Sequence, residues 1–274
     1  MSQDSLTARD KSWSAIIQAR MGATRLPGKV LMDLGGKPII AYVVDRMRFC
    51  EPEKIIIAIP DKTSDNPLSE WARKNDVEFV RGSEDDVLSR ILLASEKCPS
   101  DILIRATADN PFIETEIILK TVQSLINENA DYAVMDGSPV GTTIEAFTRN
   151  TLGRLDKIAK SPDEREHLSI AIWNNPDLFK IILLETPSYF RCDGLRLTID
   201  TENDLRLARL LFNALAGDMR MITLREIIKY VNHNPLVKRI NAGVEQHLDK
   251  WLKAKKSELS HIQTAVKIHH LQES

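Results

Sequence analysis

The chain has 274 residues, and its 37 Lys and Arg nearly balance its 39 Asp and Glu, for a formal net charge of −2. This balance excludes a protein whose whole surface attracts nucleic acid, and 43% hydrophobic with 28% charged residues is typical of an ordinary globular protein. The length corresponds to one large domain or two small ones.

The sequence predicts a cytoplasmic protein. No apolar run approaches the ~18 residues that a membrane span requires. Residues 1–12 are polar, are expected to be flexible, and lack the apolar core of a secretion signal. The three cysteines lie far apart without a CxxC pair, so neither a disulfide framework nor a zinc ribbon is expected.

Apolar runs and helical periodicity alternate over the first half of the chain. Pro38 is expected to open a helix, and Ser83 is expected to cap another with Glu84, Asp85 and Asp86 in its first turn. The alternation predicts an α/β fold with a mostly parallel sheet covered by helices on both faces. Strands are predicted at 13–19, 54–59, 77–80, 102–106 and 132–135, and further helices at 68–74 and 117–126.

The second half is more mixed but is expected to complete one catalytic domain over 13–242. Ser161, Pro162 and Glu164 form a capping box for a helix that continues through Trp173, and Thr201 caps another helix. Strands are predicted at 143–148, 178–184 and 195–199.

The segment 243–274 is predicted to be an appended amphipathic helix. Its apolar residues follow steps of three and four, which place them along one helical face. Such a face is expected to dock on the body or on a second copy, so a homodimer is possible. The residues of this seam are Leu248, Leu252, Leu259, Ile262 and Val266.

A cationic, glycine-containing loop follows the first predicted strand. Arg20, Arg25 and Lys29 lie in it together with Gly22 and Gly28. Ligands bind at the carboxyl ends of strands in open α/β sheets, where glycine backbone and cationic side chains suit phosphate oxygens. The spacing does not match a P-loop or a GxGxxG fingerprint. From spacing alone, a phosphate site and a solvated loop both remain open.

Two aspartates also follow predicted strands, Asp109 after 102–106 and Asp200 after 195–199. Facing carboxylates repel unless a cation lies between them, and hard oxygen ligands suit Mg²⁺. No basic partner for either aspartate is expected nearby in the sequence. The alternative is that Asp109 forms a turn before Asn110 and that Asp200 simply precedes the Thr201 cap.

Much of the chain, from about residue 14 to residue 215, resembles a known family. The resemblance rests on five strings: IIQARMGATRLPGKVLMDLGGKPII at 16–40, RGSEDDVLSR at 81–90, RATADNPFIE at 105–114, REH at 165–167 and LRLTIDTENDL at 195–205. The chain is similar to the cytidylyltransferases named after the spore coat polysaccharide biosynthesis protein SpsF, which are related to CMP-sugar synthetases for 3-deoxy-manno-octulosonate and acylneuraminate. Ala108 and Ala23 stand where that pattern usually has Gly and Ser.

The resemblance implies a nucleotide-diphosphosugar transferase (GT-A-like) fold and a Mg²⁺-dependent transfer of CMP from CTP to a sugar acid or a related acceptor, with release of pyrophosphate. The product would serve surface polysaccharide or glycoconjugate synthesis. The implied partners are CTP and a small acceptor, with neither nucleic acid nor membrane. The implied site consists of Arg20, Arg25 and Lys29 on the triphosphate, Ala19, Gly22, Ser83 and Asp86 on the nucleotide, Asp109 and Asp200 on the metal, and Glu145 and His167 on the acceptor.

Two alternatives share the same fold. One is a glycosyltransferase that uses a nucleotide-sugar donor, and the other is a non-catalytic binding relative. Three loop cations favour a triphosphate over a diphosphosugar, and the pair Asp109 and Asp200 favours an enzyme.

Overall fold

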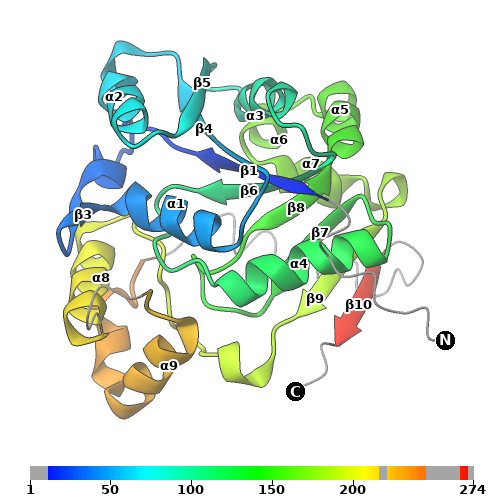
Figure 1. The fold of residues 1–274 in the computed structure, drawn as a ribbon. Helices are drawn as coiled ribbons and strands as arrows, with labels where there is room; N and C mark the ends of the chain where they lie inside the picture. The colour runs from blue at the N-terminus through cyan, green and yellow to red at the C-terminus, as the bar shows by residue number, and fades with distance from the viewer. Residues whose placement is uncertain (1–11, 216–220, 245–265, 271–274) are drawn as a thin grey trace.

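The fold is built around one eight-stranded sheet. In the computed structural model, which describes residues 12–215, 221–244 and 266–270, the strand order is β10-β9-β7-β8-β6-β1-β4-β5 (Figure 1). Among these strands only β8 runs antiparallel to its neighbours, so the predicted mostly parallel sheet is confirmed. The strands are β1 Trp13–Gln18, β4 Lys54–Pro60, β5 Glu78–Gly82, β6 Ile102–Thr107, β7 Tyr132–Asp136, β8 Glu145–Thr148, β9 Ile181–Glu185 and β10 Val266–His270.

Helices cover both faces of the sheet, as predicted. The side chains of β1 alternate between two cores, because Ala15 and Ile17 face one side and Ile16 faces the other. The first core contains α1 Ile39–Phe49, α2 Asn66–Lys74, α4 Thr115–Asn127, α8 Glu202–Leu215 and α9 Leu224–His233. The second contains α3 Val87–Glu96, α5 Arg149–Ile158 and α7 Leu168–Asn174, with α6 Pro162–Glu166 lying against α3 and α7.

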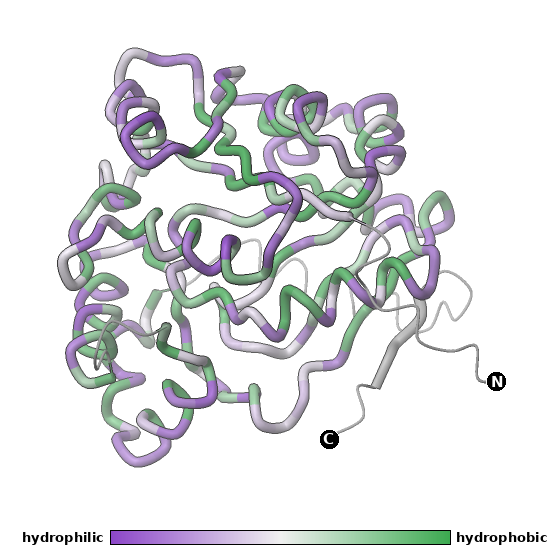
Figure 2. The backbone as a smooth tube through the Cα atoms, in the orientation of Figure 1, coloured by the Kyte–Doolittle hydropathy of each residue, from purple (hydrophilic) through white to green (hydrophobic). Residues whose placement is uncertain are grey.

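The hydropathy of the residues follows this arrangement of a central sheet covered by helices. The tube in Figure 2 is largely green, or hydrophobic, along the central strands, and it alternates between green and purple along the helices. Among the described residues, no helix combines the length and the apolar character that crossing a bilayer requires.

The start of α3 differs from the prediction. The helix begins at Val87, and Asp86 is its N-cap, since the Asp86 carboxylate accepts a hydrogen bond of 2.9 Å from the Ser89 amide. The Ser83 hydroxyl instead accepts from the Asp86 amide at 3.0 Å. Aspartate caps helices as well as serine does, so the cap falls at the acidic residue next to the apolar stripe, and Glu84 and Asp85 precede the helix.

The predicted helix from Pro162 to Trp173 is in fact two helices. Its capping box at Ser161 and Glu164 is confirmed. The chain breaks at His167, whose φ of −118° and ψ of 91° are not helical, and α7 begins at Leu168. The break lets α7 bury its apolar residues in the second core, while α6 buries none of its own. His167 therefore lies at a corner and not within a helix.

The segment 195–199, which is predicted to be a strand, is not a strand of the sheet. It forms one isolated bridge, between Val140 and Arg196. Two backbone hydrogen bonds fix the segment: the Leu197 amide donates to Val140 at 2.7 Å, and the Ile199 amide donates to the carbonyl of Asp109 at 3.0 Å. These bonds still bring Asp200 to the end of β6, as the predicted strand would have done.

The C-terminal segment is strand, not helix, where the structure describes it. Residues 266–270 form β10, which pairs in parallel with β9 so that Val266 lies opposite Ile181. The prediction of a helix is therefore wrong at Val266, and the rest of its seam lies outside the described residues. The edge of a sheet carries unpaired amides and carbonyls, and β10 supplies partners for those of β9.

Candidate active site

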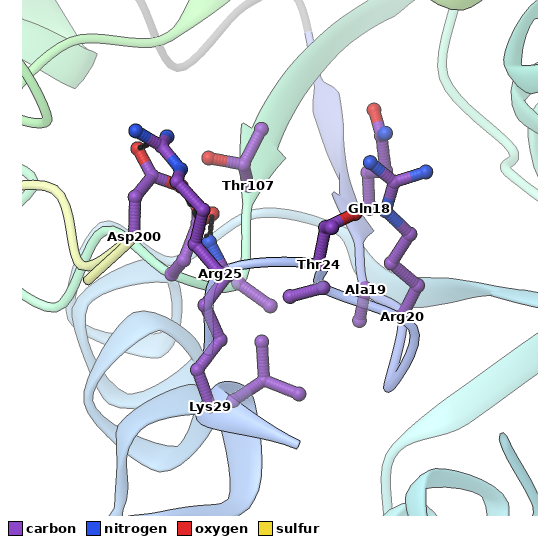
Figure 3. A pocket seen from close by; sticks show the side chains of 12 residues that line it. Gln18, Ala19, Arg20, Thr24, Arg25, Lys29, Thr107 and Asp200 are labelled. Atoms are coloured by element: carbon purple, nitrogen blue, oxygen red, sulfur yellow. Dashed lines mark hydrogen bonds and ion pairs between the residues drawn. The ribbon is translucent and has the colours of Figure 1, made fainter. Parts of the chain in front are cut away.

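A cavity of about 240 Å³ opens at the carboxyl ends of β1 and β6. Figure 3 shows Arg25, Lys29 and Asp200 on one side of it and Gln18 and Arg20 on the other. It is lined by Gln18, Ala19, Arg20, Ala23, Thr24, Arg25, Lys29, Val30, Thr107, Ala108, Asp109 and Asp200. The structure thus brings together the predicted triphosphate residues and the predicted metal residues.

The loop after β1 is held by its own backbone. The amide of Gly28 donates to the carbonyl of Met21 at 2.9 Å, and the amide of Met21 donates to Asp65 at 2.7 Å. Gly28 has a φ of 73°, a left-handed conformation that glycine adopts without strain. This turn starts a short 3₁₀ helix, Lys29–Leu31, and Lys29 extends from its first residue towards the cavity.

Lys29 lies between the two carboxylates. Its Nζ donates to Asp109 Oδ2 at 2.5 Å and to Asp200 Oδ1 at 2.7 Å, and the residue is only 7% exposed. Burial lowers the pKa of the ammonium, but the charges of both carboxylates and the hydrogen bonds to them outweigh burial and raise it. Lys29 is therefore a buried, charged group, and not a solvated loop cation.

Asp200 is further held by a buried polar network that the sequence analysis missed. Its Oδ2 contacts the guanidinium of Arg196 and lies 3.4 Å from Arg25 Nη2. Asp204 accepts from Arg196 Nε at 3.2 Å and from the amide of Asp200 at 3.1 Å, and Asn241 Nδ2 donates to Asp204 at 2.8 Å. The expectation that Asp200 has no basic partner nearby in the sequence is therefore wrong, because Arg196 lies four residues before it.

Sequence signals for this network were uneven. Arg196 and Asp204 both lie in the string LRLTIDTENDL, so their spacing from Asp200 was visible. Asn241 lies in a different part of the chain, after a 3₁₀ helix at Pro235–Ile240, and no pattern marked it.

The opposite side of the cavity is also cationic. Arg20 lies 3.7 Å from Glu166 in a solvent-accessible pair. Gln18 accepts from Arg105 Nε and Nη2 at 3.0 and 2.7 Å. Arg90 is fully buried, and its Nε and Nη2 have no hydrogen-bond partner among the described residues. Burial, followed by the charges of Arg20 and Arg105, lowers the pKa of Arg90 to about 10, so positive charge is concentrated here.

Glu145 and His167, predicted for the acceptor, lie around Arg105 and not in the cavity lining. Glu145 accepts from Arg105 Nη1 at 2.5 Å and from the Tyr132 hydroxyl at 2.8 Å. Burial and the charge of Glu145 raise the pKa of Tyr132 well above its ordinary value. Burial, followed by the charge of Arg105, lowers the pKa of His167 from its ordinary value, which favours the neutral imidazole.

Gly22, Ser83 and Asp86, predicted to contact the nucleotide, are not among the residues that line the cavity. A Cβ at Gly22 would lie 3.1 Å from the carboxylate of Glu84, so the two loops approach closely. Ser83 is exposed. The Asp86 carboxylate caps α3 with Oδ1 and accepts from Arg165 at 2.7 Å with Oδ2. Both of its oxygens therefore already have partners.

Asp109 and Asp200 suit magnesium only if a bound substrate supplies further oxygen ligands to the ion. Asp109 and Asp200 offer hard oxygens that converge on one point, although Lys29 Nζ occupies that point. Among the described residues, no three acidic, histidine or cysteine side chains gather as a metal site. Magnesium typically takes one or two carboxylates and completes its shell with substrate phosphates and water. The donor set agrees with that arrangement.

The mostly parallel, helix-covered sheet with this site at its strand ends matches solved structures with an α/β nucleotidyltransferase fold. The family described as "Cytidylyltransferase" matches residues 14–238, and the chain belongs to this family of CTP-using nucleotidyltransferases.

The chain is also similar to individual proteins over most of its length. The chain is 35% identical to the spore coat polysaccharide biosynthesis protein SpsF of Bacillus subtilis over 240 residues, covering 85% of this chain and 98% of SpsF. It is 38% identical to an uncharacterized protein of Methanocaldococcus jannaschii over 232 residues, covering 84% and 95% of the two chains. A cytidylyltransferase structure from Leptospira borgpetersenii superposes with a TM-score of 0.77 at 28% identity, covering 86% of this chain and 100% of that one.

Proposed function

We propose that this protein transfers CMP from CTP to a sugar acid or a related small acceptor and releases pyrophosphate, in a reaction that depends on Mg²⁺. The observation that carries the proposal is the convergence of Arg25 and Lys29 with Asp109 and Asp200 in one strand-end cavity. Cations bind the triphosphate there, and carboxylates hold a metal on its oxygens.

The protein's part in the reaction is positioning and charge neutralisation. Arg25 and Lys29 lie on one side of the cavity and Arg20 on the other (Figure 3). In the proposed reaction these three cations bind the triphosphate from both sides. Asp109 and Asp200 hold Mg²⁺, which supplies Lewis-acid stabilisation of the phosphate charge when bound. The oxygen of an acceptor hydroxyl attacks the α-phosphorus and its proton passes to water. The bond between the α-phosphorus and the oxygen that bridges to the β-phosphorus breaks, and pyrophosphate leaves with that oxygen. No covalent enzyme intermediate is required.

The acceptor is proposed to lie towards Arg105, Glu145 and His167. Arg20, Arg90 and Arg105 concentrate positive charge on that side, which favours an acidic acceptor. A product of this kind serves as an activated precursor for surface polysaccharide or glycoconjugates, in line with the name of the SpsF relative.

A nucleotide screen tests the proposal. The four nucleoside triphosphates and a set of nucleotide-sugars are compared in a thermal-shift assay with Mg²⁺, and pyrophosphate release is then measured with a panel of sugar acids. CTP at ~100 times its Kd is expected to stabilise the fold by about 2.7 kcal/mol. Stabilisation by a nucleotide-sugar without stabilisation by CTP would instead support the glycosyltransferase alternative.

Arg25→Ala is expected to reduce kcat/KM for CTP by about 10²–10³-fold, the loss typical of one positioned donor to a developing charge. Its side chain is 48% exposed, so the free energy of unfolding is expected to change by no more than about 0.5 kcal/mol. Pyrophosphate release and urea denaturation measure the two effects. Arg206→Ala on α8, also exposed, is the matched control and is expected to behave like wild type. Equal turnover in Arg25→Ala and Arg206→Ala would place the triphosphate elsewhere.

A further inference from the structure

The ammonium of Lys29 occupies the point at which the two active-site carboxylates converge. Nζ lies 2.5 Å from Asp109 Oδ2 and 2.7 Å from Asp200 Oδ1, and both aspartate side chains are largely buried, with 21% and 15% exposure. Two carboxylates so close together both stay ionised only if a cation lies between them. In this structure the chain supplies that cation itself.

This arrangement leaves little room for a divalent ion in the free protein. Both oxygens of Asp200 are in use, Oδ1 with Lys29 and Oδ2 with Arg196 and Arg25. Mg²⁺ binds oxygen at 2.0–2.1 Å. An ion bound to the facing oxygens of Asp109 and Asp200 would meet the Lys29 ammonium in the same place, and like charges at that distance repel strongly.

A triphosphate changes this balance. It brings several negative charges into a cavity that Lys29 already lines, and these charges offer the ammonium a second set of partners. Mg²⁺ that arrives on the triphosphate also brings phosphate oxygens as ligands, so it needs only the two carboxylates from the protein.

We propose that Lys29 is an internal counter-ion that closes Asp109 and Asp200 to divalent cations in the free protein and leaves them only when a nucleoside triphosphate enters with its metal. Metal and nucleotide then bind as one unit. This inference rests on the proposed function for the identity of the ligand, but the exclusion of free metal by Lys29 is a property of the protein alone.

The test is Mn²⁺ binding in the absence of nucleotide. Binding is monitored by the electron paramagnetic resonance signal of the free ion and by calorimetry. Wild type is expected to show no binding at this site. Lys29→Met removes the charge at similar length and is expected to bind Mn²⁺ at least about 10-fold more tightly than wild type, because a neighbouring like charge is gone. Mn²⁺ is also expected to raise the melting temperature of Lys29→Met but not that of wild type.

Three further variants separate charge from structure. Lys29→Arg keeps a cation and is expected to exclude Mn²⁺ as wild type does. Lys29→Met combined with Asp109→Asn is expected to lose the Mn²⁺ site again. Lys37→Met removes an exposed lysine that pairs with Asp45, and it is expected to match wild type. Circular dichroism reports whether each variant is folded.

Two outcomes overturn the inference: nucleotide-free wild type binds Mn²⁺ at Asp109 and Asp200, or a folded Lys29→Met binds it no more tightly than wild type does. The wild-type measurement decides even if Lys29→Met does not fold. Because no CTP is present, these outcomes are independent of the proposed reaction. A protein that gains Mn²⁺ binding in Lys29→Met but never uses CTP would contradict the proposed function and retain this inference.

Discussion

Asparagine at position 109 or 200 is expected to lower pyrophosphate release from CTP by roughly 10³-fold, because each change removes a carboxylate from the proposed metal. The two residues act on the same ion, so the double variant is expected to be hardly slower than either single one. Pyrophosphate release across a Mg²⁺ titration measures the effect. The fold of each single variant is expected to survive, since Lys29 keeps a hydrogen bond to the remaining carboxylate.

The control for these variants is Asp61→Asn. Asp61 is an exposed aspartate that pairs with Arg81 outside the cavity. The Asp61→Asn substitution removes the same charge from the chain and is expected to leave turnover unchanged. Near-normal rates in Asp109→Asn or Asp200→Asn at saturating Mg²⁺ would refute the assignment of these residues to a metal.

Gly141→Ala is expected to destabilise the protein by about 2–5 kcal/mol, from roughly 1–2 for a side chain in left-handed backbone and roughly 1–3 for overpacking. Gly141 has a φ of 93°, and a Cβ there would lie 2.3 Å from the amide nitrogen of Thr198 and 2.8 Å from the carbonyl carbon of Leu197. These are backbone atoms of the segment that carries Asp200, so the segment must move. Activity is therefore expected to fall together with stability.

Urea denaturation and pyrophosphate release measure both effects of Gly141→Ala. Gly153→Ala is the matched control, because Gly153 lies in α5 and a Cβ there would meet no atom within 4 Å. It is expected to stabilise the helix by about 0.5–1 kcal/mol. If Gly141→Ala unfolds at the same urea concentration as wild type, the backbone contact is not as close as described.

The sequence predicted the sheet well, because buried parallel strands are continuous apolar runs such as the one in β4. The sequence-based prediction was wrong where contacts between distant segments determine the local structure. The segment 195–199 has the alternation of a strand, yet its backbone bonds go to Val140 and Asp109, and it joins no strand of the sheet. At residues 266–270, the open edge of β9 pairs with a segment whose apolar spacing also suited a helix.

For the site, the sequence identified residues but not their relations. Arg20, Arg25, Lys29, Asp109 and Asp200 were chosen by residue type and by position at strand ends, and all five line one cavity. The ion pairs of Lys29 join residues 80 and 171 positions apart, so no local pattern could reveal them. The same holds for the contact between Asn241 and Asp204, which are 37 positions apart.

The hydrogen bond from the Ile199 amide to the Asp109 carbonyl holds the backbone next to Asp200 at a fixed distance from the backbone of Asp109. It joins the residue just before Asp200 to the main chain of Asp109 itself, so backbone atoms set the spacing of the carboxylates. The side chain of Lys29 then bridges the two carboxylates across that spacing. This backbone link does not involve Arg105 or His167, so residues on the side proposed for the acceptor can be exchanged without moving Asp109 and Asp200 apart. The proposed chemistry on the phosphates is thereby separated from the proposed choice of the molecule that receives the nucleotide.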